Sequence, residues 1–455
     1  MTTPPGATRL RPFLGLPALV LFGITFVGPT APFPMFGIVS AVSKGHMALA
    51  YLIAMFAMVL TALSYGRMSA AYPAAGSAYT YSRRALHPIA GFLVGWTMLL
   101  DYLLLPLLSV IYVSLTFSRL IPSVPYGIWL VLFALVMTAT NMFGLKVTNK
   151  ANFVMTAIMI AAVAWFAAAA IHALFIGRGD GVLLSTKPFY NPDAFSLRSV
   201  MAGTSIAAFS YLGFDGISTL AEDCRNPRRD IGRATVLVCV ISASLFILQA
   251  YLGQLLWPNF TTFPSVETAF LDVARVAGGA ALFSMVSFVL VVAGFASAIT
   301  GQASASRLLF GMGRDRLLPA RLFTYIHPKY STPTYGVLTV GVVAVLGGFF
   351  LSFQLAAEAV NFGALLGFMS VNLSVISHYL IRERERGRSA MLHSFLLPFG
   401  GFLVCLYVFL NLSGTAKWVG IVWCGAGLIL LTFLTSGFRV KLDDLVPEQA
   451  FAEEN

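Results

Sequence analysis

Twelve long runs of apolar residues divide the sequence, and glycine, proline or charged residues stand at their ends. A helix needs about 20 apolar residues to cross the hydrocarbon core of a bilayer. The pattern therefore predicts an all-α integral membrane protein with twelve transmembrane helices. These are expected over Leu16–Val42, Ala48–Met68, Ile89–Thr116, Tyr126–Met142, Phe153–Leu174, Val200–Leu220, Ala234–Trp257, Ala280–Ser304, Thr334–Leu351, Ala357–Tyr379, Phe395–Leu412 and Val419–Phe438.

Two of these runs are interrupted by helix breakers. The first contains Gly28-Pro-Thr-Ala-Pro-Phe-Pro34, and prolines spaced so closely must break a helix. The sixth contains Ser210-Tyr-Leu-Gly-Phe-Asp-Gly216, a weaker breaker that comes five runs later. Matched interruptions of this kind point to a transporter built from an inverted repeat, with a binding site near the membrane midplane. The alternative is that proline and glycine only kink closely packed helices.

The predicted organisation follows from these interruptions. Residues 16–174 and 200–380 would form the two repeats of five helices each. An extracellular loop at 175–199 would join them, and two extra C-terminal helices at 381–438 would follow. This arrangement leaves no room for a large soluble domain.

Composition supports the membrane assignment. Hydrophobic residues make up 58% of the 455 residues and charged residues only 10%, whereas soluble domains carry about 25% charged residues. So few charged side chains cannot coat the apolar surface of the protein, which must therefore face lipid. A soluble globular protein is excluded.

The basic residues predict the orientation. If the first tail is cytoplasmic, only seven of the 29 lysines and arginines lie outside, which leaves 22 inside. This bias matches the positive-inside rule and predicts cytoplasmic tails at 1–15 and 439–455. Because the basic residues are scattered singly, the formal charge of +11 does not indicate a nucleic-acid partner. The outer seven are Lys44, Arg119, Arg178, Lys187, Arg198, Arg275 and Lys417.

Asp101 and Asp215 are the acidic residues placed within apolar runs at positions where a charge is costly. Asp101 stands near the middle of the third run, and its alternative role is a hydrogen bond to a neighbouring Tyr or Ser. Asp215 begins the second half of the interrupted sixth run, where a carboxylate can also cap the new half-helix. Both are candidate partners for an ammonium group.

Aromatic residues accompany the carboxylates and both interruptions, and aromatic faces with carboxylates suit an organic cation. With 38 phenylalanines in the chain, such clustering is also expected from composition alone. The candidate substrate-binding residues are Gly28, Pro29, Thr30, Phe33, Phe36, Asp101, Tyr102, Phe209, Ser210, Tyr211, Gly213, Phe214 and Asp215.

Ser297 and Thr300 lie three apart in the eighth run and would share one helix face. With backbone carbonyls freed at Val27 and Gly28, they could complete an oxygen cage for sodium. The alternative is that these hydroxyls bond to their own helix backbone. No metal site is expected, because the four cysteines lie far apart and no histidine pair has ligand spacing.

Several motifs resemble the amino acid-polyamine-organocation permeases. They are Tyr72-Pro-Ala-Ala-Gly-Ser-Ala-Tyr79, Gly95-Trp-Thr-Met-Leu-Leu-Asp-Tyr102, Phe209-Ser-Tyr-Leu-Gly-Phe-Asp215, Asn226-Pro-Arg-Arg-Asp-Ile231, Arg307-Leu-Leu-Phe-Gly-Met-Gly-Arg-Asp315 and His327-Pro-Lys-Tyr-Ser-Thr-Pro333. Phe36-Gly-Ile-Val-Ser40, Leu100-Asp-Tyr102 and Asn361-Phe-Gly-Ala-Leu365 are similar to the branch of bacterial putrescine importers. The resemblance implies a bacterial inner-membrane permease with a five-plus-five repeat and alternating access.

Two departures from the family pattern bear on the substrate. Amino-acid members usually hold the substrate carboxylate with amides of a Gly-Ser-Gly-like turn, whereas Pro29 has no amide hydrogen to donate. The resemblance also implies an aspartate where this chain has Pro34, so one ammonium partner is missing. The missing amide favours a small amine over a zwitterion. The missing aspartate makes a monoamine or another small polar solute a stronger candidate.

The sequence therefore predicts a secondary active importer of a small, putrescine-like amine. No cofactor is expected, and protons are favoured over sodium as the coupling ion. The first alternative is an amino-acid or other small polar solute permease or exchanger with the same fold. A receptor that binds without transport is disfavoured because no signalling domain is attached. An intramembrane enzyme is disfavoured because no catalytic motif stands out in the apolar runs.

Overall fold

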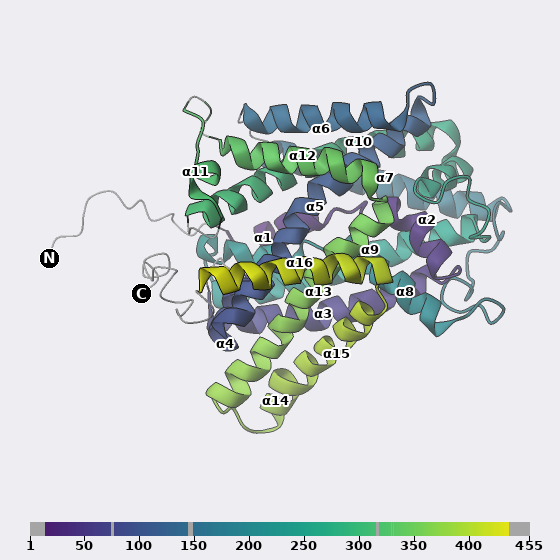
Figure 1. Ribbon diagram of the computed structural model, residues 1–455. Helices are drawn as coiled ribbons and strands as arrows, with labels where there is room; N and C mark the ends of the chain where they lie inside the picture. The colour runs from purple at the N-terminus through teal and green to yellow at the C-terminus, as the bar shows by residue number, and fades with distance from the viewer. Residues whose placement is uncertain are drawn as a thin grey trace.

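The computed structural model describes residues 14–73, 77–143, 149–314, 318–328, 330 and 332–435. The regular structure of these residues is helical, with one isolated bridge between Leu14 and Cys224. The long helices run roughly along one common direction (Figure 1). The prediction of an all-helical membrane protein is confirmed for this part of the chain.

The helices follow one another along the chain in two halves. The first half contains α1 (Leu16–Val27), α2 (Pro32–Val42), α3 (Met47–Ala71), α4 (Ser77–Ala85), α5 (Pro88–Leu120), α6 (Tyr126–Met142) and α7 (Asn149–Phe175). The second half contains α8 (Leu197–Ala207), η1 (Ala208–Tyr211), η2 (Phe214–Asp223), α9 (Pro227–Leu256), α10 (Ala269–Arg314), α11 (Ala320–Phe323), α12 (Thr334–Phe350), α13 (Phe353–Val375), η3 (Ile376–Arg382), α14 (Arg388–Ala390), η4 (Met391–Leu396), α15 (Leu397–Leu410) and α16 (Gly414–Leu434).

Many of these helices are long enough to cross a membrane. Within the described residues, nine satisfy the length and hydropathy of a spanning helix, and the bent pair α1 and α2 would make a tenth. The helices α6 and α12 are also apolar but have 17 residues each. Each of the twelve predicted runs falls on one of these helical stretches. Three parts of the predictions lie outside the described residues: residues 436–438 of the last run, residues 1–13 of the predicted tail at 1–15, and the predicted tail at 439–455.

The first interruption separates α1 from α2 by a bend of 57°. Gly28 closes α1 with φ +82°, a backbone conformation that side chains of L-residues rarely adopt. Pro32 then starts α2, where a helix loses nothing by lacking the proline amide hydrogen. The glycine and prolines therefore break this helix through purely local effects.

The second interruption lies between α8 and η2. The α-helix gives way to the 3-10 turn η1, Leu212 is extended, and Gly213 has φ +110°. The half-helix η2 that follows is also of the 3-10 type. The structure thus breaks the chain at both places that the sequence indicated.

The predicted start of the eighth run at Ala280 agrees with a helix start. Gly278 and Gly279 have non-helical backbone angles, so α10 (Ala269–Arg314) consists of two helices that meet at a kink. The second helix begins directly after Gly279, where the run was expected to start. The helical segment that begins at Ala269, before the kink, was not predicted.

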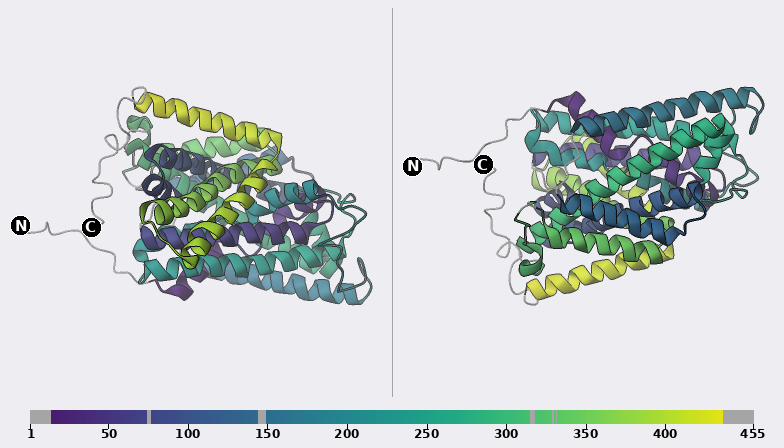
Figure 2. Two further views of the ribbon diagram at one scale, coloured as in Figure 1. Left: turned by 90° about the horizontal axis from the view of Figure 1, so that it is seen from below. Right: turned by 90° about the horizontal axis from the view of Figure 1, so that it is seen from above.

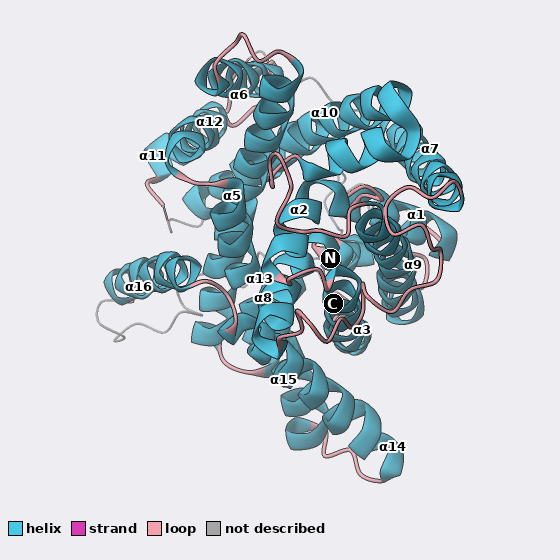
Figure 3. Cartoon of the chain, turned by 90° about the vertical axis from the view of Figure 1, so that its right-hand side faces the viewer, coloured by secondary structure: helices cyan, strands magenta, loops and turns pink. Residues whose placement is uncertain are grey.

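Of the first broken helix, α2 lies inside the bundle, whereas α1 has only three buried residues. In the end-on view, α2 lies near the middle, while α14, α15 and α16 lie at the periphery (Figure 3). Both views of Figure 2 show α16 at the outer edge. It is joined to α5 by a reciprocal pair: the indole rings of Trp96 and Trp423 stack at 4.9 Å, and each Nε1 donates to the backbone carbonyl of the other.

Candidate functional site

The two helix breaks meet through hydrogen bonds. The Ser210 hydroxyl, in η1, lies 3.4 Å from the Ala31 carbonyl, which precedes α2. The Tyr51 hydroxyl of α3 lies 2.9 Å from the same Ser210 oxygen, and Tyr211 donates to the Tyr51 carbonyl. Ser210 and Ala31, which are 179 positions apart in the sequence, are thereby held together. Peptide groups freed by one break are paired by side chains of the other.

Phe26 fills the space left by the second break. An ideal Cβ on Gly213 would lie 2.7 Å from Phe26 Cδ1, and one on Gly216 would lie 2.8 Å from Phe26 Cε1. These approaches leave no room for a side chain at either glycine. The Phe26 residue is 45% exposed.

The two predicted carboxylates come together at this place. Asp101, near the middle of α5, and Asp215, at the start of η2, are close enough to interact electrostatically. Both side chains are partly exposed. The Asp215 carboxylate also accepts hydrogen bonds from backbone groups of Gly213, Asp215 and Gly216. Its carboxylate therefore faces peptide N–H groups at the beginning of a half-helix, where an anion is stabilised.

Neither carboxylate has a cationic partner among the described residues of the chain. Two carboxylates held near one another within a membrane are unfavourable unless a cation joins them. The arrangement therefore supplies a place that an organic cation or a proton would stabilise.

Two tyrosines border the carboxylates. Tyr102, which was predicted, interacts electrostatically with both Asp101 and Asp215. Tyr65 of α3, which was not predicted, interacts with Asp215 and Tyr102 and packs edge-on against Phe214 at 5.9 Å. The available signal for Tyr65 was its polar hydroxyl group inside the second apolar run. No pattern in the sequence, however, indicates that α3 faces η2.

Two buried carboxamides support the backbone around the breaks, and the site prediction missed both. Gln249 of α9 donates from Nε2 to the carbonyl of Pro29, and Asn361 of α13 donates from Nδ2 to the carbonyl of Ser205. Each side chain is at most 1% exposed, and the carboxamide oxygen of each lacks a hydrogen-bond partner among the described residues. An amide in the middle of an apolar run was the available signal for both.

The predicted aromatic residues take different places. Phe33 and Phe36 are each 1% exposed and pack in a group with Phe166 and Phe270, which we call the aromatic cluster. Phe33 stacks on Phe270 with ring centroids 3.7 Å apart. The cluster lies on the α2 side of the first break, so these two rings fill space between α2, α7 and α10.

The remaining predicted aromatics belong to η1 and η2. Tyr211 and Phe214 are fully buried, whereas Phe209 is only partly buried. Tyr211 packs against Phe246 at 5.2 Å, and Phe214 packs against Phe368 at 5.1 Å. The two buried rings fix the second break against α9 and α13.

The sodium candidates are differently exposed. Val27 is buried and Gly28 is partly buried, but the Ser297 and Thr300 side chains of α10 are exposed. The Thr300 carbonyl accepts a hydrogen bond from Ser304 at 3.0 Å. A sodium cage built from these oxygens would require Ser297 and Thr300 to become enclosed.

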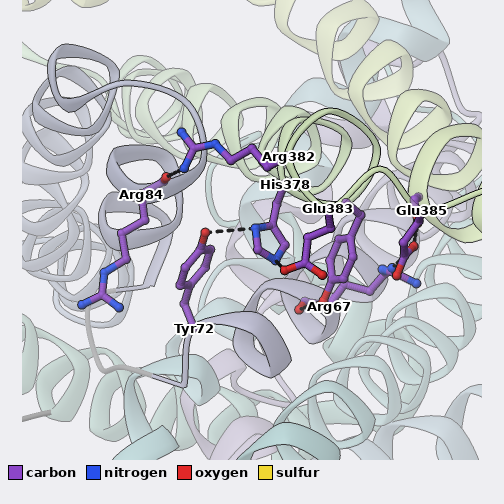
Figure 4. Close-up of polar contacts among 9 residues, drawn as sticks. Arg67, Tyr72, Arg84, His378, Arg382, Glu383 and Glu385 are labelled. Atoms are coloured by element: carbon purple, nitrogen blue, oxygen red, sulfur yellow. Dashed lines mark hydrogen bonds and ion pairs between the residues drawn. The ribbon is translucent and has the colours of Figure 1, made fainter. Parts of the chain in front are cut away.

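A polar cluster lies at the opposite end of the bundle from α2. The His378 ring, in η3, lies between the Tyr72 hydroxyl at 3.0 Å and the Glu383 carboxylate at 3.5 Å (Figure 4). Arg67 pairs with Glu385 at 3.0 Å, and its guanidinium lies 3.8 Å from the centre of the Tyr379 ring. These contacts join the π-helical end of α13 to the end of α3.

Comparison with known proteins gives a consistent match. The family model described as amino acid permease matches residues 26–415. The low-affinity putrescine importer PlaP of Escherichia coli strain K12 is 36% identical over 440 residues, which cover 95% of each chain. The branched-chain amino acid permease BcaP of Bacillus subtilis is 25% identical over 465 residues, covering 96% of each. The methylthioribose transporter of the same organism is 26% identical over 443 residues, covering 90% of this chain and 91% of its own.

Proposed function

Because the chain belongs to the amino acid permease family, we propose that it is a secondary transporter that imports a small organic amine across the plasma membrane of a bacterium. The substrate would be a putrescine-like polyamine or a monoamine. The similar Escherichia coli protein is a putrescine importer, which supports this class of substrate.

The observation that carries the proposal is the pair Asp101 and Asp215. They interact with one another, are partly exposed, and have no cationic partner among the described residues. An ammonium group can supply the missing charge, while the Tyr102 ring and the partly exposed Phe26 ring can contact its methylene groups or its charge. A neutral ligand would leave both carboxylates without compensation.

The proposed architecture is twelve spans, with 16–174 and 200–380 as inverted repeats, two further helices, and both termini in the cytoplasm. Helices over all twelve apolar runs support it, as do breaks in the first and sixth runs. Alternating access would then expose the region of the two breaks first to one side and then to the other. In this scheme the buried aromatic cluster would close the α2 side.

Protons are the proposed coupling ion. The two carboxylates can bind and release a proton in each cycle, because an unpaired carboxylate in a membrane is more stable when neutral. The exposure of Ser297 and Thr300 supports sodium less. In proteoliposomes, uptake should follow an imposed pH gradient and persist without sodium; uptake that requires sodium and ignores the pH gradient would exclude this coupling.

The direct test is uptake of radiolabelled putrescine by purified protein in liposomes. Accumulation that a monoamine competes with, and a branched-chain amino acid does not, would support an amine substrate. Accumulation of amino acids alone would support the alternative, a permease for zwitterions, which the similarity to BcaP favours. Binding without flux under any gradient would contradict transport altogether.

A further inference from the structure

A cavity of about 490 Å³ opens at the end of the bundle where α2 ends and α13 begins. Its apolar wall contains Ile38 and Ala41 of α2 and Val266 of the loop between α9 and α10. Ser265 and Glu267 of the same loop provide polar groups. We call it the outer cavity. Its volume lies within the range of about 300 to 1,000 Å³ that is typical of small-molecule pockets.

The aromatic cluster separates the outer cavity from the helix breaks. Along α2, the chain passes from the break to Phe33 and Phe36, and only then to Ile38 and Ala41. The opposite wall has the same order, with Phe270 of the aromatic cluster lying beyond Glu267 along the chain. A molecule in the outer cavity is therefore not in contact with Asp101 or Asp215.

Glu267 differs from the other acidic side chains near this end of the bundle. Asp180 pairs with Lys187 at 3.3 Å, Asp272 pairs with Arg119, and Glu358 accepts hydrogen bonds from Gln354 and from the Ser413 amide. Glu267 is partly buried but forms no hydrogen bond or ion pair with any described residue. Its burial raises the pKa of the carboxyl, because the charged form has lost part of its water without gaining a partner.

The start of α13 contributes two further polar side chains to the outer cavity. The Ser352 hydroxyl accepts the Leu355 amide at 3.1 Å, and Gln354 donates from its amide nitrogen to Glu358 at 2.9 Å, which leaves the Gln354 carboxamide oxygen as an acceptor. Ser265, next to Glu267, has no hydrogen-bond partner among the described residues. Among these groups Glu267 is the one that carries a charge, and it lies in the same lining as apolar side chains of α2.

On the basis of the proposed function, we propose that the outer cavity is an extracellular binding site for the cationic amine. Glu267 pairs with an ammonium group, Ser265 accepts a hydrogen bond from it, and Ile38, Ala41 and Val266 contact its methylene groups. Because Ile38 and Ala41 belong to α2, an occupant touches the half-helix that follows the first break.

The first test is the concentration dependence of putrescine uptake in intact cells. Glu267→Gln should raise the KM about three- to fivefold, as expected for loss of a partly exposed charge pair, with kcat retained. Glu267→Asp should keep most of the affinity. Asp193→Asn is the matched control, since it removes one exposed negative charge from the predicted extracellular loop and should leave the KM unchanged.

The second test measures occupancy directly. Ser265→Cys, in protein carrying Cys424→Ser to remove the one partly exposed native cysteine, is treated with a membrane-impermeant maleimide. Putrescine should slow labelling of the introduced thiol, and butane-1,4-diol, which has the same length but no charge, should not. Protection should survive Asp101→Asn and disappear with Glu267→Gln.

The outcomes separate this inference from the proposed function. If wild-type protein imports putrescine but the amine slows no labelling, or if Glu267→Gln leaves both the KM and the protection unchanged, the outer site is wrong and the importer stands. Protection without any uptake would keep the outer site and remove the import proposal. Absence of both would overturn both.

Discussion

Asp101 and Asp215 differ in how the fold supports them. Asp215 receives backbone hydrogen bonds at the start of η2, whereas Asp101 lies within α5 and has no such support. Asp101→Asn should therefore weaken amine binding, because the ammonium group loses one of its two carboxylate partners, while the melting temperature stays close to that of the wild type. Normal amine affinity in a well-folded Asp101→Asn protein would remove this residue from the site.

Asp215→Asn should lower both amine affinity and stability. The lost capping interaction alone costs about 1 kcal/mol, and the ammonium partner is lost with it. Amine affinity and thermal unfolding are to be measured on the same purified sample. A stable Asp215→Asn protein with weakened binding would show that the carboxylate serves the substrate and not the half-helix.

The two glycines at the breaks carry different constraints. Gly28 has φ +82° with nothing near an ideal Cβ, whereas a Cβ on Gly213, at φ +110°, would also meet Phe26. Gly28→Ala should cost about 1 to 3 kcal/mol of backbone strain, and Gly213→Ala should cost more. Adding Phe26→Ala should relieve only the Gly213→Ala protein. Equal relief in both variants, seen in thermal unfolding, would contradict this assignment.

At the level of single residues, the sequence predicts those features that depend only on neighbouring residues, such as a helix break. Gly28, its neighbouring prolines and Gly213 break helices wherever they are placed, and a mid-helix aspartate is conspicuous by its cost. Gln249 and Tyr65 were missed because their partners, the Pro29 carbonyl and Asp215, lie far away along the chain. Phe33 and Phe36 illustrate the same limit, since in a chain with 38 phenylalanines nothing indicates which ring meets which.

At the level of helices, α3 and α9 pack through two facing glycines. An ideal Cβ on Gly66 would lie 2.8 Å from the Gly232 Cα, and one on Gly232 would lie 2.7 Å from the Gly66 Cα. Small residues allow such close helix contact in membranes. Gly66→Ala should therefore destabilise the protein by about 1 to 3 kcal/mol, because the two backbones must separate.

The matched control for this helix contact is Gly425→Ala on α16, where an added Cβ meets open space and should cost nothing. Gly66→Ala combined with Gly232→Ala should cost less than the sum of the single changes, since the first already separates the helices. Strict additivity in thermal unfolding would indicate that the two glycines do not face each other.

Helix positions were largely predictable because an apolar run of sufficient length has few alternatives in a membrane. The backbone conformation within each run was less predictable. The 3-10 character of η2 and the helical segment that begins at Ala269, before the kink at Gly278 and Gly279, both depend on packing against other helices, which hydropathy does not encode. The register of α13 against α3 and α4 could not be predicted from hydropathy either. This register brings together the polar cluster around His378.

At the level of the whole molecule, the distribution of basic residues predicts the orientation in the membrane. A reporter fused after Asn455 should be active only in the cytoplasm, because 22 of the 29 lysines and arginines would lie on that side. As the complementary measurement, Asp193→Cys should react with an impermeant maleimide in intact cells. A periplasmic signal from the reporter would reverse the assignment of both ends, and of the outer cavity with them.

The aromatic cluster should affect how the rate of uptake depends on temperature. Burying one phenylalanine removes about 150 to 250 Å² from water, and each Å² of apolar surface exposed adds about 0.45 cal/mol per kelvin to the heat capacity. If opening on the α2 side wets all four rings, its heat capacity rises by roughly 0.3 kcal/mol per kelvin. When that opening limits uptake, a plot of log rate against reciprocal temperature must bend, and replacing Phe33 by Ala should reduce the curvature by about a quarter.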